Sequence, residues 1–276
     1  IKTWTPATIV MVVLIILVSA VALDRMMYGL GAATNMNDGY PWGFWLGMDV
    51  LGGVAMAAGG FIIACAVYLF NWKKYRPIVR PAILTAFLGY LMAVAAIFLD
   101  IGHPFRLPHP MFMWQYHSVM WVVAMHVIFY TTTLALEFSP MLFERLGWEK
   151  ARQAVGKVMV GAVIFGVMLS TLHQSSLGAT YGILTARPFW YSPSAPVLFI
   201  LSAIAAGISA VLALTIVSGR LLHRQLVPKD ILNSVARFAG FAVLAYLYLK
   251  LWSWAATNYY SHVPDKALGL EILNQY

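Results

Sequence analysis

The 276-residue sequence has little charge and a single cysteine. Charged residues make up 10% of the chain, against roughly 25% in an ordinary globular domain, whereas hydrophobic residues make up 61%. So little charge cannot cover the surface of a soluble protein of this size, and lipid must cover much of it. Cys65 alone can form no internal disulfide, and it cannot supply the roughly four thiolates that an iron–sulfur cluster takes.

The sequence also lacks the short motifs of nucleotide and metal chemistry. It contains no Walker A motif, no G-x-G-x-x-G loop, no C-x-x-C pair and no H-E-x-x-H. The formal net charge is +8, but the basic residues fall in short segments between apolar runs. That pattern favours contact with anionic lipid over nucleic-acid binding. We predict no metal site and no nucleic-acid partner.

Seven apolar segments are long enough to cross a membrane, which takes about 20 residues. They run approximately over residues 6–23, 42–70, 82–101, 114–137, 154–180, 196–219 and 231–256. The sequence therefore predicts an all-α integral membrane protein, a polytopic helix bundle in one domain over residues 1–276. Residues 257–276 resemble a loop entering another helix, so we expect an eighth span beyond the end of this sequence.

Basic residues are distributed unevenly between the predicted loops. Three alternate loops carry ten of them: Lys73, Lys74, Arg76, Arg80, Arg145, Lys150, Arg152, Arg220, Arg224 and Lys229. The other three loops carry only Arg25, Arg106 and Arg187. The positive-inside rule places the first group and the N-terminus in the cytoplasm. We expect a multi-pass protein of a bacterial or archaeal inner membrane, with the first span retained rather than cleaved as a signal peptide.

Ionisable residues within the predicted spans gather near the opposite, outer side. Such residues are costly in lipid and indicate function by default. They come from six helices and are Arg25, Asp49, Asp100, His117, His173 and Lys250. Two interpretations remain open. The groups form structural ion pairs, or they bind a quinone, whose carbonyls need hydrogen-bond donors and whose two-electron reduction takes up two protons.

A second polar pattern lies along the span 114–137. His126, Tyr130, Thr133 and Glu137 are spaced by four, three and four residues, which places them on one helix face. The stripe is either interhelical hydrogen bonding or a proton path towards the cytoplasm. His117 is nine residues from His126, about half a turn round the helix, so we expect the stripe and the outer cluster to face different ways. We also expect His126 and His173 to lie at different depths, which argues against a haem held between them.

Several stretches form a more specific pattern. They are G-Y-P-W-G (39–43), V-R-P-A-I (79–83), D-I-G (100–102), S-V-M-W (118–121) and L-E-F-S-P-M-L-F-E-R-L-G-W (136–148). The most specific is S-T-L-H-Q-S-S-L-G (170–178). With these motifs the chain resembles the NrfD/polysulfide reductase C family of quinone-interacting membrane subunits. Within that family it resembles the large membrane subunit of outward-facing uptake nickel–iron hydrogenases.

The resemblance implies a bundle without a redox centre of its own, with no haem and no iron–sulfur cluster. It implies an extracytoplasmic iron–sulfur subunit docked on the bundle, a catalytic subunit beyond it, and a quinone, menaquinone or ubiquinone, near the docking face. The positions that match the family are Arg25, Asp49, Asp100, His173, Gln174 and Ser175. Two departures are Val122, where the family has a glutamate, and seven spans in place of eight or more.

We therefore predict a quinone-reactive membrane anchor of a multi-subunit respiratory oxidoreductase of the hydrogenase type. His173 and His117 are expected to hydrogen-bond the quinone carbonyls, and Asp49 and Asp100 to pass protons or orient the histidines. The expected binding residues are Arg25, Gln174, Ser175, Arg106 and Lys250. A purely structural anchor and an ion- or proton-coupled transporter are the alternatives, although broken helices and inverted repeats are not evident.

Overall fold

The computed structural model describes residues 6–34, 36–37, 47, 52–184 and 190–261. The helices are α1 (Pro6–Tyr28), α2 (Leu30–Ala33), α4 (Val54–Tyr68), α5 (Arg76–Asp100), α6 (Val119–Leu146), α7 (Glu149–Gly182), α8 (Ala195–Leu221) and α9 (Lys229–Ser261). Six of them, all but α2 and α4, have the length and composition to cross a membrane. The predicted all-α membrane fold is confirmed. The predicted span 42–70 falls partly outside the described residues, and its described helix, α4, has 15 residues.

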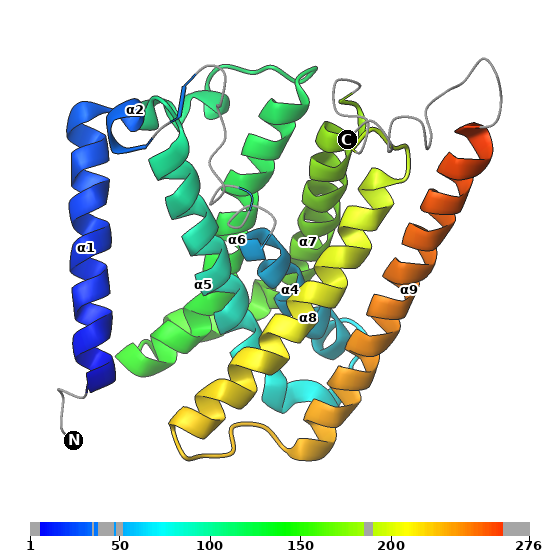
Figure 1. The fold of residues 1–276 in the computed structure, drawn as a ribbon. Helices are drawn as coiled ribbons and strands as arrows, with labels where there is room; N and C mark the ends of the chain where they lie inside the picture. The colour runs from blue at the N-terminus through cyan, green and yellow to red at the C-terminus, as the bar shows by residue number, and fades with distance from the viewer. Residues whose placement is uncertain (1–5, 35, 38–46, 48–51, 185–189, 262–276) are drawn as a thin grey trace.

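The long helices run alternately up and down the bundle (Figure 1). α1, α5, α7 and α9 end on the side where α6 and α8 begin, and we call this side the Arg25 end. The opposite side, where α5 begins and α6 ends, is the Arg80 end. α4 packs against α5, α7 and α8, α6 lies between α5 and α7, and α9 packs on α8. α4 is therefore the centre of the bundle, with ten of its 15 residues buried.

Two glycines bring α4 and α8 into backbone contact. A Cβ added to Gly59 would lie 2.2 Å from the carbonyl carbon and oxygen of Gly207, and one added to Gly207 would lie 2.3 Å from the carbonyl oxygen of Ala55. Only a residue without a side chain fits at either position, since real contacts of a Cβ are longer. Close approach through small residues is the usual means of packing helices in lipid, where no hydrophobic force holds them together.

α1 is almost unpartnered in the bundle. Its large apolar side chains are exposed, as expected for a helix that faces lipid. Its buried Arg25 donates hydrogen bonds to the backbone carbonyls of Leu99 and Ile101 at the end of α5. A cation at these carbonyls also complements the negative end of the α5 dipole. Arg25 therefore ties α1 to the bundle.

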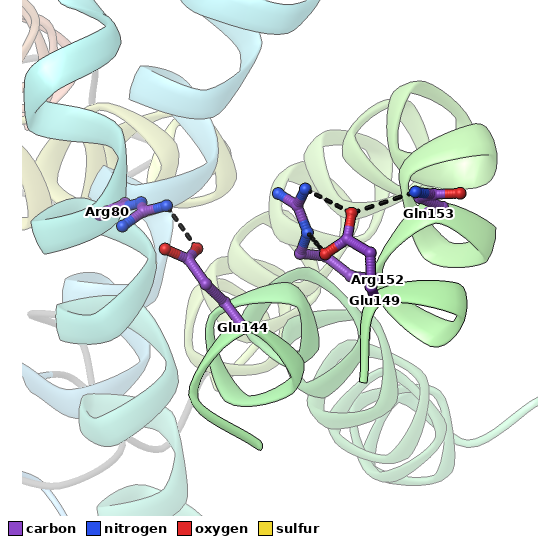
Figure 2. A network of polar contacts seen from close by, with 5 residues as sticks. All are labelled: Arg80, Glu144, Glu149, Arg152 and Gln153. Carbon is purple, nitrogen blue, oxygen red and sulfur yellow. Dashed lines mark hydrogen bonds and ion pairs between the residues drawn. The ribbon is translucent and has the colours of Figure 1, made fainter. Parts of the chain in front are cut away.

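Charged side chains join the helices at the Arg80 end, as Figure 2 shows. Arg80 of α5 donates to Glu144 of α6 at 2.6 Å, and Arg152 and Gln153 both donate to Glu149 at the start of α7. Gly147 between α6 and α7 has φ +71°, the left-handed conformation that ends a helix in a tight turn. These ion pairs are exposed to solvent screening, so they contribute little to the stability of the fold.

Candidate functional site

A buried cluster of imidazole and phenol rings lies inside the bundle. Its centre is His173 of α7, whose side chain is 1% exposed. The ring centroid of His173 lies 6.1 Å from that of His126, 6.2 Å from that of Tyr90 and 6.3 Å from that of Tyr130. These neighbours come from α5 and α6, so three helices contribute to what we call the His173 cluster: Tyr90, His126, Tyr130 and His173.

The cluster contains polar atoms without partners. Among the described residues, none forms a hydrogen bond with the Tyr90 hydroxyl, His126 Nδ1 or His173 Nδ1. A buried polar group left unpaired costs about 1–3 kcal/mol, and most buried polar groups in proteins are paired. Three such groups within one apolar bundle therefore mark a candidate site for proton chemistry or for a polar ligand.

The packing of α4 holds the cluster from one side. The Phe61 ring stacks on Tyr130 at 4.8 Å, and Tyr130 meets the edge of Tyr90 at 4.6 Å. Gly166 of α7 makes room for Phe61, because an added Cβ there would lie 1.8 Å from the phenylalanine ring. Tyr90 and Phe61 were not predicted as site residues, since each stands in an apolar run without any distinguishing spacing.

The stripe on α6 shares one helix face, as its spacing predicted, and that face is directed into the bundle. Tyr130 is 0%, Thr133 5% and Glu137 2% exposed, while His126 is half-buried. The Thr133 hydroxyl donates to the Phe129 carbonyl and is thereby satisfied. Both carboxyl oxygens of Glu137 lack a hydrogen-bond partner among the described residues. Glu137 is thus a second buried polar group, two turns of α6 beyond Tyr130 towards the Arg80 end.

The predicted gathering of six ionisable groups is wrong for His117 and Lys250, because both side chains are exposed. His117 precedes α6, whose N-cap is Ser118, and is exposed in a turn. Lys250 is exposed on α9, a helix that packs mainly on α8. The predicted Asp49 lies outside the described residues. His117 and Lys250 are therefore not companions of His173.

Of the remaining predicted residues, Arg25, Asp100 and Arg106 lie at the Arg25 end, away from His173, whereas Ser175 follows His173 by two residues on α7. Asp100 ends α5, ten residues or about 15 Å along the helix beyond Tyr90. Arg25 binds backbone carbonyls on either side of Asp100, and Arg106 is exposed in a short 3-10 turn. Ser175 is half-buried and donates to the Leu172 carbonyl. The deep His173 cluster and the Arg25 end are therefore separate groups of residues.

The expected difference in depth between His126 and His173 is also wrong. His126 lies seven residues, or about 10 Å, inside the start of α6, and His173 lies nine residues, or about 14 Å, inside the end of α7. Their rings face each other, so depth gives no argument against a shared haem. The rings of Tyr90 and Tyr130 also lie beside His173, at centroid distances of 6.2 Å and 6.3 Å. No group of three metal-ligating side chains occurs within the described ranges.

A cavity of about 150 Å³ lies beside α7, next to the His173 cluster. Ser170, Thr171 and Gln174 line it from α7, with Phe61 from α4 and Ala203 from α8. Gln174 is 6% exposed and follows His173 directly in the chain. Phe61 borders the cavity and stacks on Tyr130, so one aromatic ring separates the cavity from the His173 cluster.

The fold and this site define a class, a polytopic helical membrane protein with a polar cluster buried between its helices. The family described as "Polysulphide reductase, NrfD" matches residues 32–268. The chain belongs to the NrfD family. The resemblance that the sequence motifs indicated is thereby confirmed.

Three relatives are similar over much of the chain. A protein of Nitratidesulfovibrio vulgaris is 38% identical over 99% of this chain and 74% of its own length. The probable Ni/Fe-hydrogenase 2 b-type cytochrome subunit of Escherichia coli is 37% identical over 72% of this chain and 52% of its own. The menaquinone reductase integral membrane subunit of N. vulgaris is 31% identical over 88% and 60%. The chain thus matches about half to three quarters of the length of these relatives.

Proposed function

We propose that the chain is the quinone-reactive membrane subunit of a multi-subunit oxidoreductase. The single observation that carries the proposal is the His173 cluster, a set of buried, unpartnered imidazole and phenol groups one ring away from a cavity. Relatives named as a menaquinone reductase subunit and a hydrogenase subunit support the same class of reaction. The substrate is a quinone or quinol from the membrane.

The cavity lined by Ser170 and Gln174 is where the quinone ring binds. Hydroxyl and amide groups there donate hydrogen bonds to its carbonyls, and Phe61 provides an aromatic face against which the ring packs. Reduction of the quinone takes two electrons and two protons. Electrons come from, or pass to, an iron–sulfur partner at the Arg25 end, which the positive-inside rule places outside the cytoplasm.

His126 and His173 hold and transfer the protons. An imidazole accepts a proton at one ring nitrogen and donates one from the other, and two adjacent imidazoles provide neighbouring sites for a proton. Glu137 extends this set towards the Arg80 end along the same face of α6. The proposed order of groups is His173, His126, Tyr130 and Glu137, which supports proton movement between the quinone site and the cytoplasmic side.

The complex purified from native membranes in mild detergent tests this function. Organic extraction should recover quinone, the co-purifying subunits should carry iron–sulfur absorbance, and no haem bands should belong to this chain. A preparation that retains its partners but contains no quinone and reduces none would favour the structural anchor. A protein isolated without partners that moves an ion or solute in vesicles would favour the transporter.

A further inference from the structure

A second, larger cavity lies closer to the Arg80 end than the first, and we call it the lower cavity. It measures about 240 Å³ and is bordered by α4, α8 and α9 on the Arg80 side, with Cys65, Trp72, Tyr75, Ile208 and Phe238 among its lining residues. The two cavities share Ile62 of α4 and Val167 of α7. The two cavities therefore adjoin at these side chains, and we call the pair the groove. Together their volumes fall within the roughly 300–1,000 Å³ of small-molecule sites.

The groove changes in character along its length. Its upper section carries three polar side chains of α7, of which Ser170 and Gln174 are buried. Its lower section is apolar, and the hydroxyls of Tyr75 and Ser234 there are joined in a hydrogen bond of 2.7 Å. At the lower section Phe70, Trp72 and Phe238 are about half exposed or more, so the groove opens towards lipid near the Arg80 end.

The position of the polar section relative to the apolar section indicates which kind of molecule fits the groove. A phospholipid has its polar head at the membrane surface and its chains at the centre. Here the polar section lies deep, because Gln174 is eight residues, or about 12 Å, from the end of α7 at Gly182. An isoprenoid quinone has the matching order when its ring lies deep and its apolar tail runs outwards.

We propose that the lower cavity binds the isoprenoid tail of the quinone whose ring lies at Ser170 and Gln174. The inference rests on the proposed function and adds the route by which the quinone reaches its site. The quinone enters between α4 and α9 from the leaflet at the Arg80 end, with the ring first. A quinone without a tail makes no contact with the lower cavity, so the cavity distinguishes between the two kinds of substrate.

Cys65, the only cysteine of the chain, is a probe inside the lower cavity. In quinone-depleted complex, a membrane-permeant maleimide is added and the Cys65 peptide is followed by mass spectrometry. Long-tailed menaquinone at ten times its Kd should slow labelling about tenfold, because protection follows the occupied fraction. Menadione, which has the ring without the tail, should leave the labelling rate unchanged. Protection by phospholipid alone at the same concentration would overturn the proposal in favour of an acyl-chain site.

A cavity-filling variant gives an independent functional test. Ala66→Phe places a ring in the lower cavity and should raise the KM for long-tailed menaquinone about tenfold, which corresponds to about 1.4 kcal/mol. The KM for menadione should not change. Ala206→Phe on the exposed face of α8 is the matched control. If Ala66→Phe fails to assemble, Cys65→Met tests the same volume.

The outcomes separate the inference from the function on which it rests. A wild-type complex that neither turns over quinone nor is protected at Cys65 would contradict the proposed function. A complex that turns over both quinones, with Cys65 labelling and the Ala66→Phe variant insensitive to the tail, would contradict the groove alone.

Discussion

The ring centroids of His126 on α6 and His173 on α7 lie 6.1 Å apart, with their planes at 61°. Neither Nδ1 has a hydrogen-bond partner among the described residues, although both are buried atoms. Buried, unpaired imidazole nitrogens cost stability, so ionisable groups of this kind inside a membrane protein indicate a function. The predictions below follow from this cluster and from the packing that holds it in place.

Replacing Glu137 with an apolar residue should stabilise the fold. Glu137→Met removes a buried, unpartnered carboxyl group and should raise the free energy of unfolding by about 1–3 kcal/mol. Thermal unfolding in detergent measures this effect, and an unchanged or lower melting temperature would show that Glu137 has a stabilising partner.

Proton stoichiometry tests the α6 stripe as a path. Glu137→Gln and His126→Leu should each lower the number of protons moved per electron in vesicles that contain the complex. Turnover is recorded in the same samples. An unchanged ratio in both variants, at normal turnover, would assign the stripe to hydrogen bonding between helices.

The contact between Gly59 and Gly207 should be intolerant of any side chain. Gly59→Ala places a Cβ 2.2 Å from the Gly207 backbone, so the helices must separate, and the loss should be about 3 kcal/mol or more. Gly161→Ala on α7 is the control, because no atom lies within 4 Å of its added Cβ. Equal melting temperatures for the two variants would mean that α4 and α8 do not meet at these glycines.

Arg25 should act as a clamp between α1 and α5. Arg25→Leu removes two charge-assisted hydrogen bonds to the Leu99 and Ile101 carbonyls, each worth about 1.5–3 kcal/mol. Amide hydrogen exchange at residues 101–107 should become faster, whereas Arg237→Leu on the exposed face of α9 should leave it unchanged. Exchange at the wild-type rate in Arg25→Leu would indicate that other contacts hold this end of α5.

The α6 stripe illustrates what the sequence could establish. Its spacing of four and three residues predicts that its members share one helix face, and the structure shows that this face is directed into the bundle. Glu137 was expected at the end of a span, but α6 continues to Leu146, so the carboxyl lies inside the bundle. Hydropathy predicts where an apolar span ends, but a helix can continue through the charged residues that follow. The predicted end at residue 137 is therefore earlier than the end of α6.

The errors about His117 and His126 have one cause. The span was taken to begin at residue 114, whereas α6 begins at Val119, with the Ser118 hydroxyl accepting from the Trp121 amide. Ser118 is a preferred N-cap residue, and that signal was available in the sequence. Because the helix begins later, His117 lies outside it. His126 is then fewer residues from the start of the helix and lies at a depth similar to that of His173. The contacts of Tyr90 and Phe61 depend on how three helices pack, which no local pattern records.

The role of His173 is tested most directly by turnover of the intact complex with two acceptors. His173→Leu should lower quinone-linked turnover about 100-fold or more, the usual effect of losing an acid–base group, while viologen-linked turnover of the catalytic partner stays at the wild-type rate. His223→Asn, in an exposed turn with φ +48° that asparagine tolerates, should leave both activities unchanged. Full quinone-linked turnover in the assembled His173→Leu complex would contradict the assignment of the His173 cluster as the quinone-coupled site.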